Sequence, residues 1–390
     1  MIYDFDQPIE RRGTDSIKWQ LFNREGNEDV LPLWVADMDF VSPEPMIQAL
    51  QQRVAHGVFG YGLPPGELRE VIQGRLATLY GWHVETDDIL LIPGVVTGFN
   101  LVCYAVGQPG DEVLVEPPVY PPMLSAPGDL GRRRKLVPLV EGEERYERDM
   151  DAFEAAITER TATFLLCSPH NPVGRVFERE ELERVAEICL RHDVLICSDE
   201  IHCDLVFKDH PHTPTAALSP EVAAQTVTLF APSKTYNVPG LACSVCVVQN
   251  PELRARLEAT VPGLVGHVNV MGLTAALAAY RDGQNWLDQV LVYLEGNRDY
   301  LLEYVASFLP GVRCCKPEGT YLAWLDCRAA AIPGNPHTFF LERARVALNE
   351  GADFGPGGEG FVRLNFACPR AVLTQALERM REALDAERAA

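Results

Sequence analysis

Short apolar segments alternate with amphipathic segments through the middle of this chain, and this alternation restricts the possible folds more than any other feature. The amphipathic stretch 178–191 places its apolar residues at i, i+3, i+4 and i+7, the spacing of one helical face. The apolar segments predict strands at 88–93, 112–116, 161–167, 194–198, 226–231 and 243–248, with a further helix at 95–106. Strands that are apolar on both faces and separated by helices predict an α/β fold, with a mainly parallel sheet between two layers of helices.

The pattern changes near residue 280, where we expect a domain boundary. Beyond it, the sequence predicts helices at 284–308, 337–349 and 370–388 and strands at 321–326 and 361–366. This mixture is typical of a smaller α+β domain. We therefore predict a large domain over 46–280, a small C-terminal domain over 281–390, and an irregular N-terminal segment, 1–45, that packs with the small domain.

The charge balance and the lack of long apolar stretches narrow the possible functions. The 390 residues carry a formal net charge of −21, so most of the surface repels nucleic acid and anionic membranes. The one basic run, Arg132–Lys135, reads as a solvated turn before a strand. No stretch approaches the roughly 18 consecutive apolar residues of a membrane span, and residues 1–16 lack a signal-peptide core. We expect a cytoplasmic protein that binds neither nucleic acid nor membrane.

The 11 cysteines are an odd number and show no paired spacing. Many of them lie in apolar runs, which indicates buried, reduced thiols. The segment Cys197–Cys203 contains Cys, Asp, Glu and His, but it lacks the paired close ligands of a structural zinc site. We therefore expect no metal.

Polar residues follow the ends of the predicted strands, where open α/β sheets bind ligands. After strand 88–93, Gly94–Thr97 opens a helix whose free N–H groups suit a phosphate, although many strand–helix turns look alike. After strand 112–116, Tyr120 lies among prolines, either as a rigid ring that stacks on a ligand or as a loop residue that covers the core.

Three further polar residues follow the next two strands. After 161–167, Asn171 lies next to a proline, where its amide either donates to a ligand oxygen or completes an Asn-Pro turn. After 194–198, Asp199 places a carboxylate at the end of a buried strand, which costs free energy unless a protonated group pairs with it. His202 is either a ligand contact or a satisfied loop histidine.

Lysine is scarce, and this scarcity singles out one residue. The five lysines are Lys18, Lys135, Lys208, Lys234 and Lys316. Four of them lie in a polar stretch, in the basic run, in a turn or before a proline. Only Lys234 follows a buried strand, where partial desolvation lowers the pKa of its amine and frees it to attack carbonyls.

Near the C-terminus, Arg363 lies inside the apolar strand 361–366 and needs an anion. That anion is either a bound carboxylate, which matches the forked guanidinium, or a structural Asp or Glu. The glycines of 355–360 have the spacing G-x-G-x-x-G of a dinucleotide-binding turn, but they precede a strand rather than open a helix. This context argues against NAD.

Taken in order, these features resemble the fold-type I pyridoxal-phosphate (PLP) enzymes of the aspartate aminotransferase superfamily over essentially the whole chain. Within that superfamily, the sequence is most similar to cystathionine β-lyases (C–S lyases) of the MalY/PatB type. The segments that carry this resemblance are 34–40, 59–62, 93–96, 199–202 and 233–235 with Asn237. The resemblance implies the PLP-dependent transferase fold, with a mainly parallel seven-stranded sheet flanked by helices and a smaller α+β C-terminal domain.

The resemblance also implies roles for the residues that would hold PLP. Lys234 would carry the cofactor as a Schiff base, Asp199 would pair with the pyridinium nitrogen, and Tyr120 would stack on the ring; these three are the expected catalytic residues. Asn171 would donate to the ring 3-oxygen. The remaining cofactor contacts would be Val95, Val96 and Ser233 on the phosphate, together with His202.

Substrate binding and assembly follow from the same resemblance. Arg363 would clamp the carboxylate of an amino-acid substrate, with Trp34, Asp37 and Tyr321 as further substrate contacts. Tyr61 would reach the phosphate of the neighbouring subunit, which implies a homodimer with shared active sites.

Two positions depart from the aminotransferase pattern. Transaminases usually carry Tyr three residues after the Asp and often Arg eight residues after the Lys, whereas this chain has His202 and Ala242. Both departures fit the lyase branch, so the expected reaction converts an S-substituted cysteine to a thiol, pyruvate and ammonia. The alternatives are a PLP-dependent aminotransferase that passes the amino group to a 2-oxo acid and a PLP-fold regulatory protein, against which the acidic charge argues.

Overall fold

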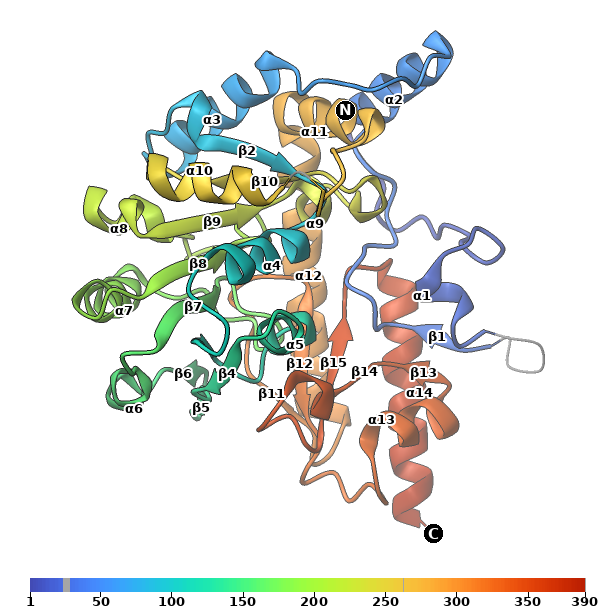
Figure 1. Cartoon of the computed structure of the whole chain (residues 1–390). Coiled ribbons are helices and arrows are strands. Elements are labelled where there is room, and N and C mark those ends of the chain that lie inside the picture. The colour runs from blue at the N-terminus through green and yellow to red at the C-terminus, as the bar shows by residue number, and fades with distance from the viewer. Residues whose placement is uncertain (24–28, 262, 390) are drawn as a thin grey trace.

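A seven-stranded sheet forms the centre of the computed structural model, which describes residues 1–23, 29–261 and 263–389 (Figure 1). Its strand order is β2-β10-β9-β8-β7-β3-β4. The strands are β2 (Ile89–Ile92), β3 (Glu112–Val115), β4 (Arg133–Leu136), β7 (Thr161–Cys167), β8 (Leu195–Asp199), β9 (Thr226–Phe230) and β10 (Ser244–Val247). The pairs from β9 to β4 are all parallel, while β10 is antiparallel to both of its neighbours. The predicted mainly parallel seven-stranded sheet is therefore confirmed.

Helices cover both faces of this sheet because its strands are apolar on both sides. Successive residues of β3 show the alternation: Val113 and Val115 belong to one core cluster, and Leu114 belongs to the other. The first cluster packs under α4 (Val95–Ala105), α5 (Pro121–Asp129) and α10 (Pro251–Thr260). The second packs under α6 (Met150–Ala156), α7 (Arg179–Arg191) and α8 (Pro220–Ala224). These layers place the carboxyl ends of the parallel strands at one shared edge.

A third group of helices packs beside the antiparallel end of the sheet. It consists of α2 (Glu44–His56), α3 (Gly66–Tyr80) and α11 (Val270–Asp282). These helices pack against one another, and their buried residues share a core cluster with Val245 and Val247 of β10. The loop between α2 and α3 contains Tyr61, which is fully exposed in the single chain.

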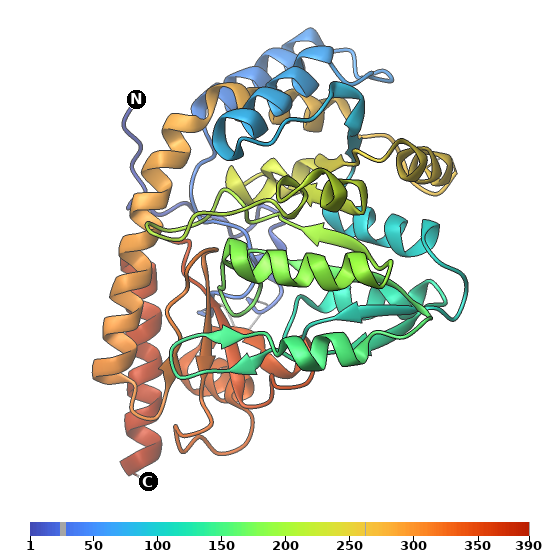
Figure 2. The ribbon, with the colours of Figure 1, turned by 90° about the vertical axis from the view of Figure 1, so that its left-hand side faces the viewer.

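The C-terminal part contains a separate four-stranded antiparallel sheet. Its order is β11 (Arg313–Cys314), β12 (Leu322–Asp326), β15 (Phe361–Asn365) and β14 (Asn349–Glu350). The long helices α12 (Gln284–Phe308) and α14 (Arg370–Ala389) lie side by side along it (Figure 2). The N-terminal strand β1 (Leu31–Pro32) pairs in parallel with β13 (Val346–Ala347). A domain boundary near residue 280 stays a prediction.

Two predictions of local structure were wrong, namely the helix at 337–349 and the solvated turn at 132–135. The helix expected at 337–349 is only the short α13 (Pro336–Phe339) followed by a π-helical turn at Phe340–Ala344. Arg345 then adopts a left-handed conformation, and the next residues form β13 and β14. The reason is tertiary: the apolar run after Arg345 pairs with β1, a partner more than 300 residues away in the chain.

The basic run Arg132–Lys135 is not a solvated turn. Arg133–Leu136 is the edge strand β4, and charged side chains suit an edge that must not pair with another molecule. Arg132 is buried, and its guanidinium donates to the carbonyls of Cys103, Tyr104, Val106 and Gly107 at the end of α4. These carbonyls have no partner inside the helix, so the arginine satisfies them.

In the described parts of the chain, no helix is long and apolar enough to cross a membrane.

Candidate active site

A cavity of about 500 Å³ lies where the parallel strands end. Asn171 follows β7, Asp199 ends β8, and Lys234 follows β9 on the short helix α9 (Pro232–Thr235). β15 of the other sheet contributes Arg363. The sequence-predicted residues that line this cavity are Trp34, Val95, Val96, Tyr120, Asn171, Asp199, His202, Ser233, Lys234 and Arg363. Residues from seven separate parts of the chain thus meet at one site.

One end of the cavity is suited to a phosphate group. The helix α4 begins there at Val95, so its first N–H groups have no partner within the helix. The hydroxyl residues Thr97, Ser233 and Ser244 also line the cavity, together with Ala242. A helix N-terminus with neighbouring hydroxyls binds a phosphate through N–H and O–H donors.

Asp199 lines the cavity as a carboxylate that has no cationic hydrogen-bond partner in the part of the chain that the structure describes. It is 4% exposed, and among the described residues the one donor to its carboxylate is the backbone N–H of Ile201, at 3.1 Å from Oδ1. Burial raises the pKa of Asp199 to about 7, with a smaller contribution from Glu200, while the Ile201 N–H and Lys234 oppose the rise. A buried carboxylate in this condition gains most from a ligand that presents a protonated nitrogen.

Arg363 is a buried cation whose hydrogen-bond partners among the described residues are all uncharged. Its Nη1 donates to Asn171 Oδ1 at 2.9 Å, and its Nη2 donates to Trp34 O at 2.9 Å and Asn349 Oδ1 at 2.6 Å. Its Nε has no hydrogen-bond partner among the described residues. Burial lowers the pKa of Arg363 to about 10. Because all its protein partners are neutral, the structural Asp or Glu considered from the sequence is not present among its described partners, and the site suits a carboxylate ligand.

Lys234 lines the same cavity and interacts electrostatically with both of these groups. Its Nζ donates to the carbonyl of Ala36 at 2.6 Å. Burial lowers the pKa of Lys234 to about 8, and Arg363 adds to this effect, while Asp37 and Asp199 oppose it. The amine is therefore neutral in an appreciable fraction of molecules near pH 8, which is the form that attacks a carbonyl or takes a proton.

His202 is neutral in this environment. It is 2% exposed, and its ring meets the Tyr321 ring edge-on at a centroid distance of 5.9 Å. Burial, followed by the charges of Lys234 and Arg363, lowers the pKa of His202 to about 3. Its Nδ1 has no hydrogen-bond partner among the described residues. The sequence left His202 as either a ligand contact or a loop histidine whose hydrogen bonds are made within the protein. The unpartnered Nδ1 favours the ligand contact.

Three of the predicted site residues do not line the cavity. Tyr321 is fully buried behind the lining residues; its Oη donates to the Ala36 carbonyl at 2.9 Å, and its ring contacts that of His202. The carboxylate of Asp37 forms an ion pair with Arg11 at 2.7 Å, so its placement does not support a substrate contact. Tyr61 is exposed on the surface of the single chain.

Two residues that hydrogen-bond Lys234 or Arg363 at the site were not predicted. Asn349 lines the cavity and bonds Arg363, but it fell in the segment that the sequence predicted as helix. Ala36 acts through its backbone carbonyl, and no side-chain pattern identifies such a group. Only the tertiary packing of the folded chain brings either residue to the site.

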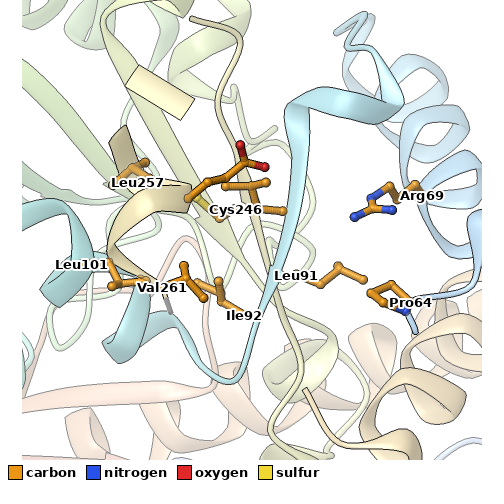
Figure 3. A pocket seen from close by; sticks show the side chains of 11 residues that line it. Pro64, Arg69, Leu91, Ile92, Leu101, Cys246, Leu257 and Val261 are labelled. Atoms are coloured by element: carbon orange, nitrogen blue, oxygen red, sulfur yellow. The ribbon is translucent and has the colours of Figure 1, made fainter. Parts of the chain in front are cut away.

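A smaller cavity of about 220 Å³ lies elsewhere, at the edge strand β2 (Figure 3). Leu91 and Ile92 of β2 and Val261 border it, with Pro64 and Arg69 at its other side. It contains no lysine and no carboxylate from a strand end, so it lacks the groups that the larger cavity assembles. Within the described ranges, no cluster of three or more His, Cys, Asp or Glu side chains could hold a metal ion.

The chain is similar to known proteins over nearly its whole length. The family model described as aminotransferase class I and II matches residues 28–380. The chain is 40% identical to the cystathionine beta-lyase PatB of Bacillus subtilis, over 98% of this chain and 100% of that protein. It is 32% identical to the protein MalY of Escherichia coli, over 99% and 100%. The crystal structure of cystalysin from Treponema denticola, which contains PLP, superposes with a TM-score of 0.94 at 33% identity, over 99% and 100%.

Proposed function

Because the chain belongs to the class I and II aminotransferase family, we propose that it is a PLP-dependent carbon–sulfur β-lyase that converts a cysteine thioether, such as cystathionine, to a thiol, pyruvate and ammonia. The observation that carries this proposal is one cavity in which a buried carboxylate, a buried guanidinium and a buried amine all lack their natural counter-groups. The full-length likeness to proteins named as cystathionine beta-lyases supports the choice of reaction.

The unpaired groups of the cavity fit PLP. Lys234 would hold the aldehyde carbon covalently through Nζ, and Asp199 would face the ring nitrogen, whose proton satisfies the buried carboxylate. The N-terminus of α4 and Ser233 would hold the phosphate. Asn171 accepts from Arg363 through Oδ1, which leaves its Nδ2 group to donate to the ring 3-oxygen. Tyr120 also lines the cavity and would stack on the ring.

The same residues account for the binding of the substrate and for the removal of its Cα proton. When bound, PLP supplies an electron sink for the pair left on the substrate Cα. Arg363 binds the substrate carboxylate and thereby orients the Cα–H bond, and the neutral amine of Lys234 takes that proton. The Cβ–S bond then breaks, and the sulfur leaves with the bonding electrons as a thiolate. The three-carbon product hydrolyses after release to pyruvate and ammonia.

Transamination is the alternative, and a single substrate distinguishes it. L-Cystathionine supplied without any 2-oxo acid is expected to give pyruvate and thiol over many turnovers, because β-elimination needs no acceptor for the amino group. Pyruvate is measured with lactate dehydrogenase and NADH, and the thiol with a disulfide reagent. A reaction that stops after one turnover per site and resumes when a 2-oxo acid is added would identify a transaminase instead.

Arg363→Lys tests the carboxylate clamp. We expect kcat/KM for cystathionine to fall roughly 10- to 100-fold, mainly through KM, because lysine keeps the charge but loses the bidentate fork. PLP affinity should stay near the wild-type value, since Arg363 contacts the substrate and not the cofactor phosphate. A loss confined to kcat, with KM unchanged, would contradict the clamp.

We also propose that the enzyme works as a homodimer with shared active sites. In the single chain, Val58, Phe59, Tyr61 and Leu63 form an exposed apolar stretch between α2 and α3, which suits a buried contact with a second copy. Tyr61 does not line its own cavity, and in the dimer it would reach the phosphate of the neighbouring subunit.

A further inference from the structure

A cluster of buried charges holds the segment Trp34–Phe40, which we call the strap. Lys18 is 1% exposed, and its Nζ donates to Asp39 Oδ2 at 2.7 Å. Arg11 bonds both acidic residues of the strap, with Nη2 at 2.7 Å from Asp37 Oδ2 and Nη1 at 2.6 Å from Asp39 Oδ1. Trp19 Nε1 donates to Asp39 Oδ1 at 3.0 Å. None of these side chains lines the cavity, so the cluster acts on the site only through the strap.

The inner side of the strap meets the reactive amine. The carbonyl of Ala36 accepts from Lys234 Nζ at 2.6 Å and from Tyr321 Oη at 2.9 Å. The next carbonyl, that of Asp37, accepts from Lys18 Nζ at 3.1 Å. The buried cluster and the reactive lysine therefore act on neighbouring peptide groups of the same short segment.

Two asparagines tie the strap to the elements that carry the chemistry. Asn365, two residues after Arg363, donates from Nδ2 to Val35 O at 2.6 Å and to Asp37 O at 2.7 Å. These two carbonyls flank that of Ala36. Asn237, three residues after Lys234, donates from Nδ2 to Met38 O and Phe40 O, both at 2.9 Å. The peptide groups on both sides of the Ala36 carbonyl are thus held by hydrogen bonds.

A contribution to the folding stability of the protein does not by itself explain this cluster of buried charges. A buried ion pair often contributes no more to folding than apolar side chains of the same volume, because desolvation offsets the attraction between the charges. What charges and hydrogen bonds provide, and apolar packing does not, is direction. We propose that Arg11, Lys18 and Asp39 are positioning residues for Lys234, and that they fix the strap so that the Ala36 carbonyl orients the lysine amine. This inference rests on the proposed function, in which that amine takes the Cα proton.

The chemistry of the contact explains how it orients the amine. A carbonyl oxygen only accepts hydrogen bonds, so a neutral Lys234 amine must point an N–H bond at Ala36 and its lone pair elsewhere. The charged and titratable groups that act on this amine are Asp199 from β8, Arg363 from β15, Asp37 from the strap, and His202. The carbonyl also favours the protonated amine, so a displaced strap should lower the pKa of Lys234 further.

The double variant Lys18→Met/Asp39→Asn tests the proposal, because it removes one buried charge of each sign with little change in volume. In the cofactor-free protein, we expect the pKa of the Lys234 amine to fall by about half a unit or more, and in the PLP-loaded enzyme kcat to fall about tenfold with KM within about twofold. The amine pKa is read from the pH dependence of acetylation at Lys234, followed by mass spectrometry.

Two further variants make the result interpretable. Arg12→Gln removes the Arg12–Glu10 pair, whose side chains are 58% and 60% exposed, and should leave both readings unchanged. Trp19→Phe removes one donor to Asp39 and should shift both readings in the same direction but less, which keeps the test open if the double variant does not fold. A folded double variant with a lower melting temperature, but with wild-type amine pKa and kcat, would show that the cluster is only structural. The acetylation reading needs neither PLP nor substrate, so it stands even if the lyase assignment fails.

Discussion

Lys234→Ala is expected to lower pyruvate release from L-cystathionine by about 10³-fold or more. General base catalysis by a positioned side chain is worth roughly 10²- to 10⁴-fold, and this variant also removes the only covalent anchor that the cavity offers to PLP. No other lysine lines the cavity among the described residues, so no second amine stands within reach to replace it. The measurement is steady-state pyruvate formation, together with the mass of the borohydride-reduced protein, which should show no covalently attached cofactor.

Lys208→Ala is the matched control. Lys208 is exposed in a turn outside the cavity, so the same substitution there should leave the rate and the attached cofactor unchanged. A Lys234→Ala protein that released pyruvate at the wild-type rate would overturn the assignment of the base and the anchor together.

Lys234, Asn171 and Asp199 line one cavity, as expected from their positions after apolar strands, and this placement has a physical reason. The carboxyl ends of parallel strands meet at one edge, so a polar residue that directly follows an apolar strand is placed by the fold itself. Asp199 could also be recognised from cost, because a carboxylate at the end of a buried strand needs a partner. The structure adds that no cation of the described residues supplies that partner through a hydrogen bond.

The features that the sequence did not reveal depend on contacts between distant segments. Ala36 reaches the site with a backbone carbonyl, which every residue has. Asn349 reaches it because its segment pairs with β15 rather than forming a helix. The prediction of Asp37 as a substrate contact did not take account of Arg11, which forms an ion pair with its carboxylate. Residue type and spacing locate groups along an element, whereas these three placements are decided by which elements pack together.

We expect Asp199→Asn to lower the activity of the enzyme but to raise the stability of the cofactor-free protein at pH 8. For function, the variant loses a buried charge partner of the protonated ring nitrogen, an effect of roughly 2–5 kcal/mol. We therefore expect kcat/KM to fall by about 10²- to 10³-fold and PLP to bind more weakly. Both are measured on the purified protein, kcat/KM by pyruvate release and PLP affinity by titration of cofactor absorbance.

The stability of the cofactor-free protein should change in the opposite sense. Burial raises the pKa of Asp199 from its ordinary value of 3.8 to about 7, so between these values the native state binds more protons than the unfolded state. Stability from this group is therefore present at low pH and is lost as the pH rises towards 7, by at most about 4 kcal/mol. Asparagine does not titrate, so the cofactor-free variant should melt at a higher temperature than wild type at pH 8 and should lose this advantage towards pH 4.

The matched control is Asp209→Asn, because Asp209 is exposed in a turn. It should leave both kcat/KM and the pH dependence of melting as in wild type. A cofactor-free Asp199→Asn protein that is less stable than wild type at pH 8 would show that the carboxylate already has adequate partners, and the cavity would then not demand a protonated ligand nitrogen. The wild-type protein loaded with PLP supplies the remaining comparison. If the ring nitrogen is the missing partner, PLP should stabilise wild type more than the variant at pH 8, because only wild type regains the charge pair that burial requires.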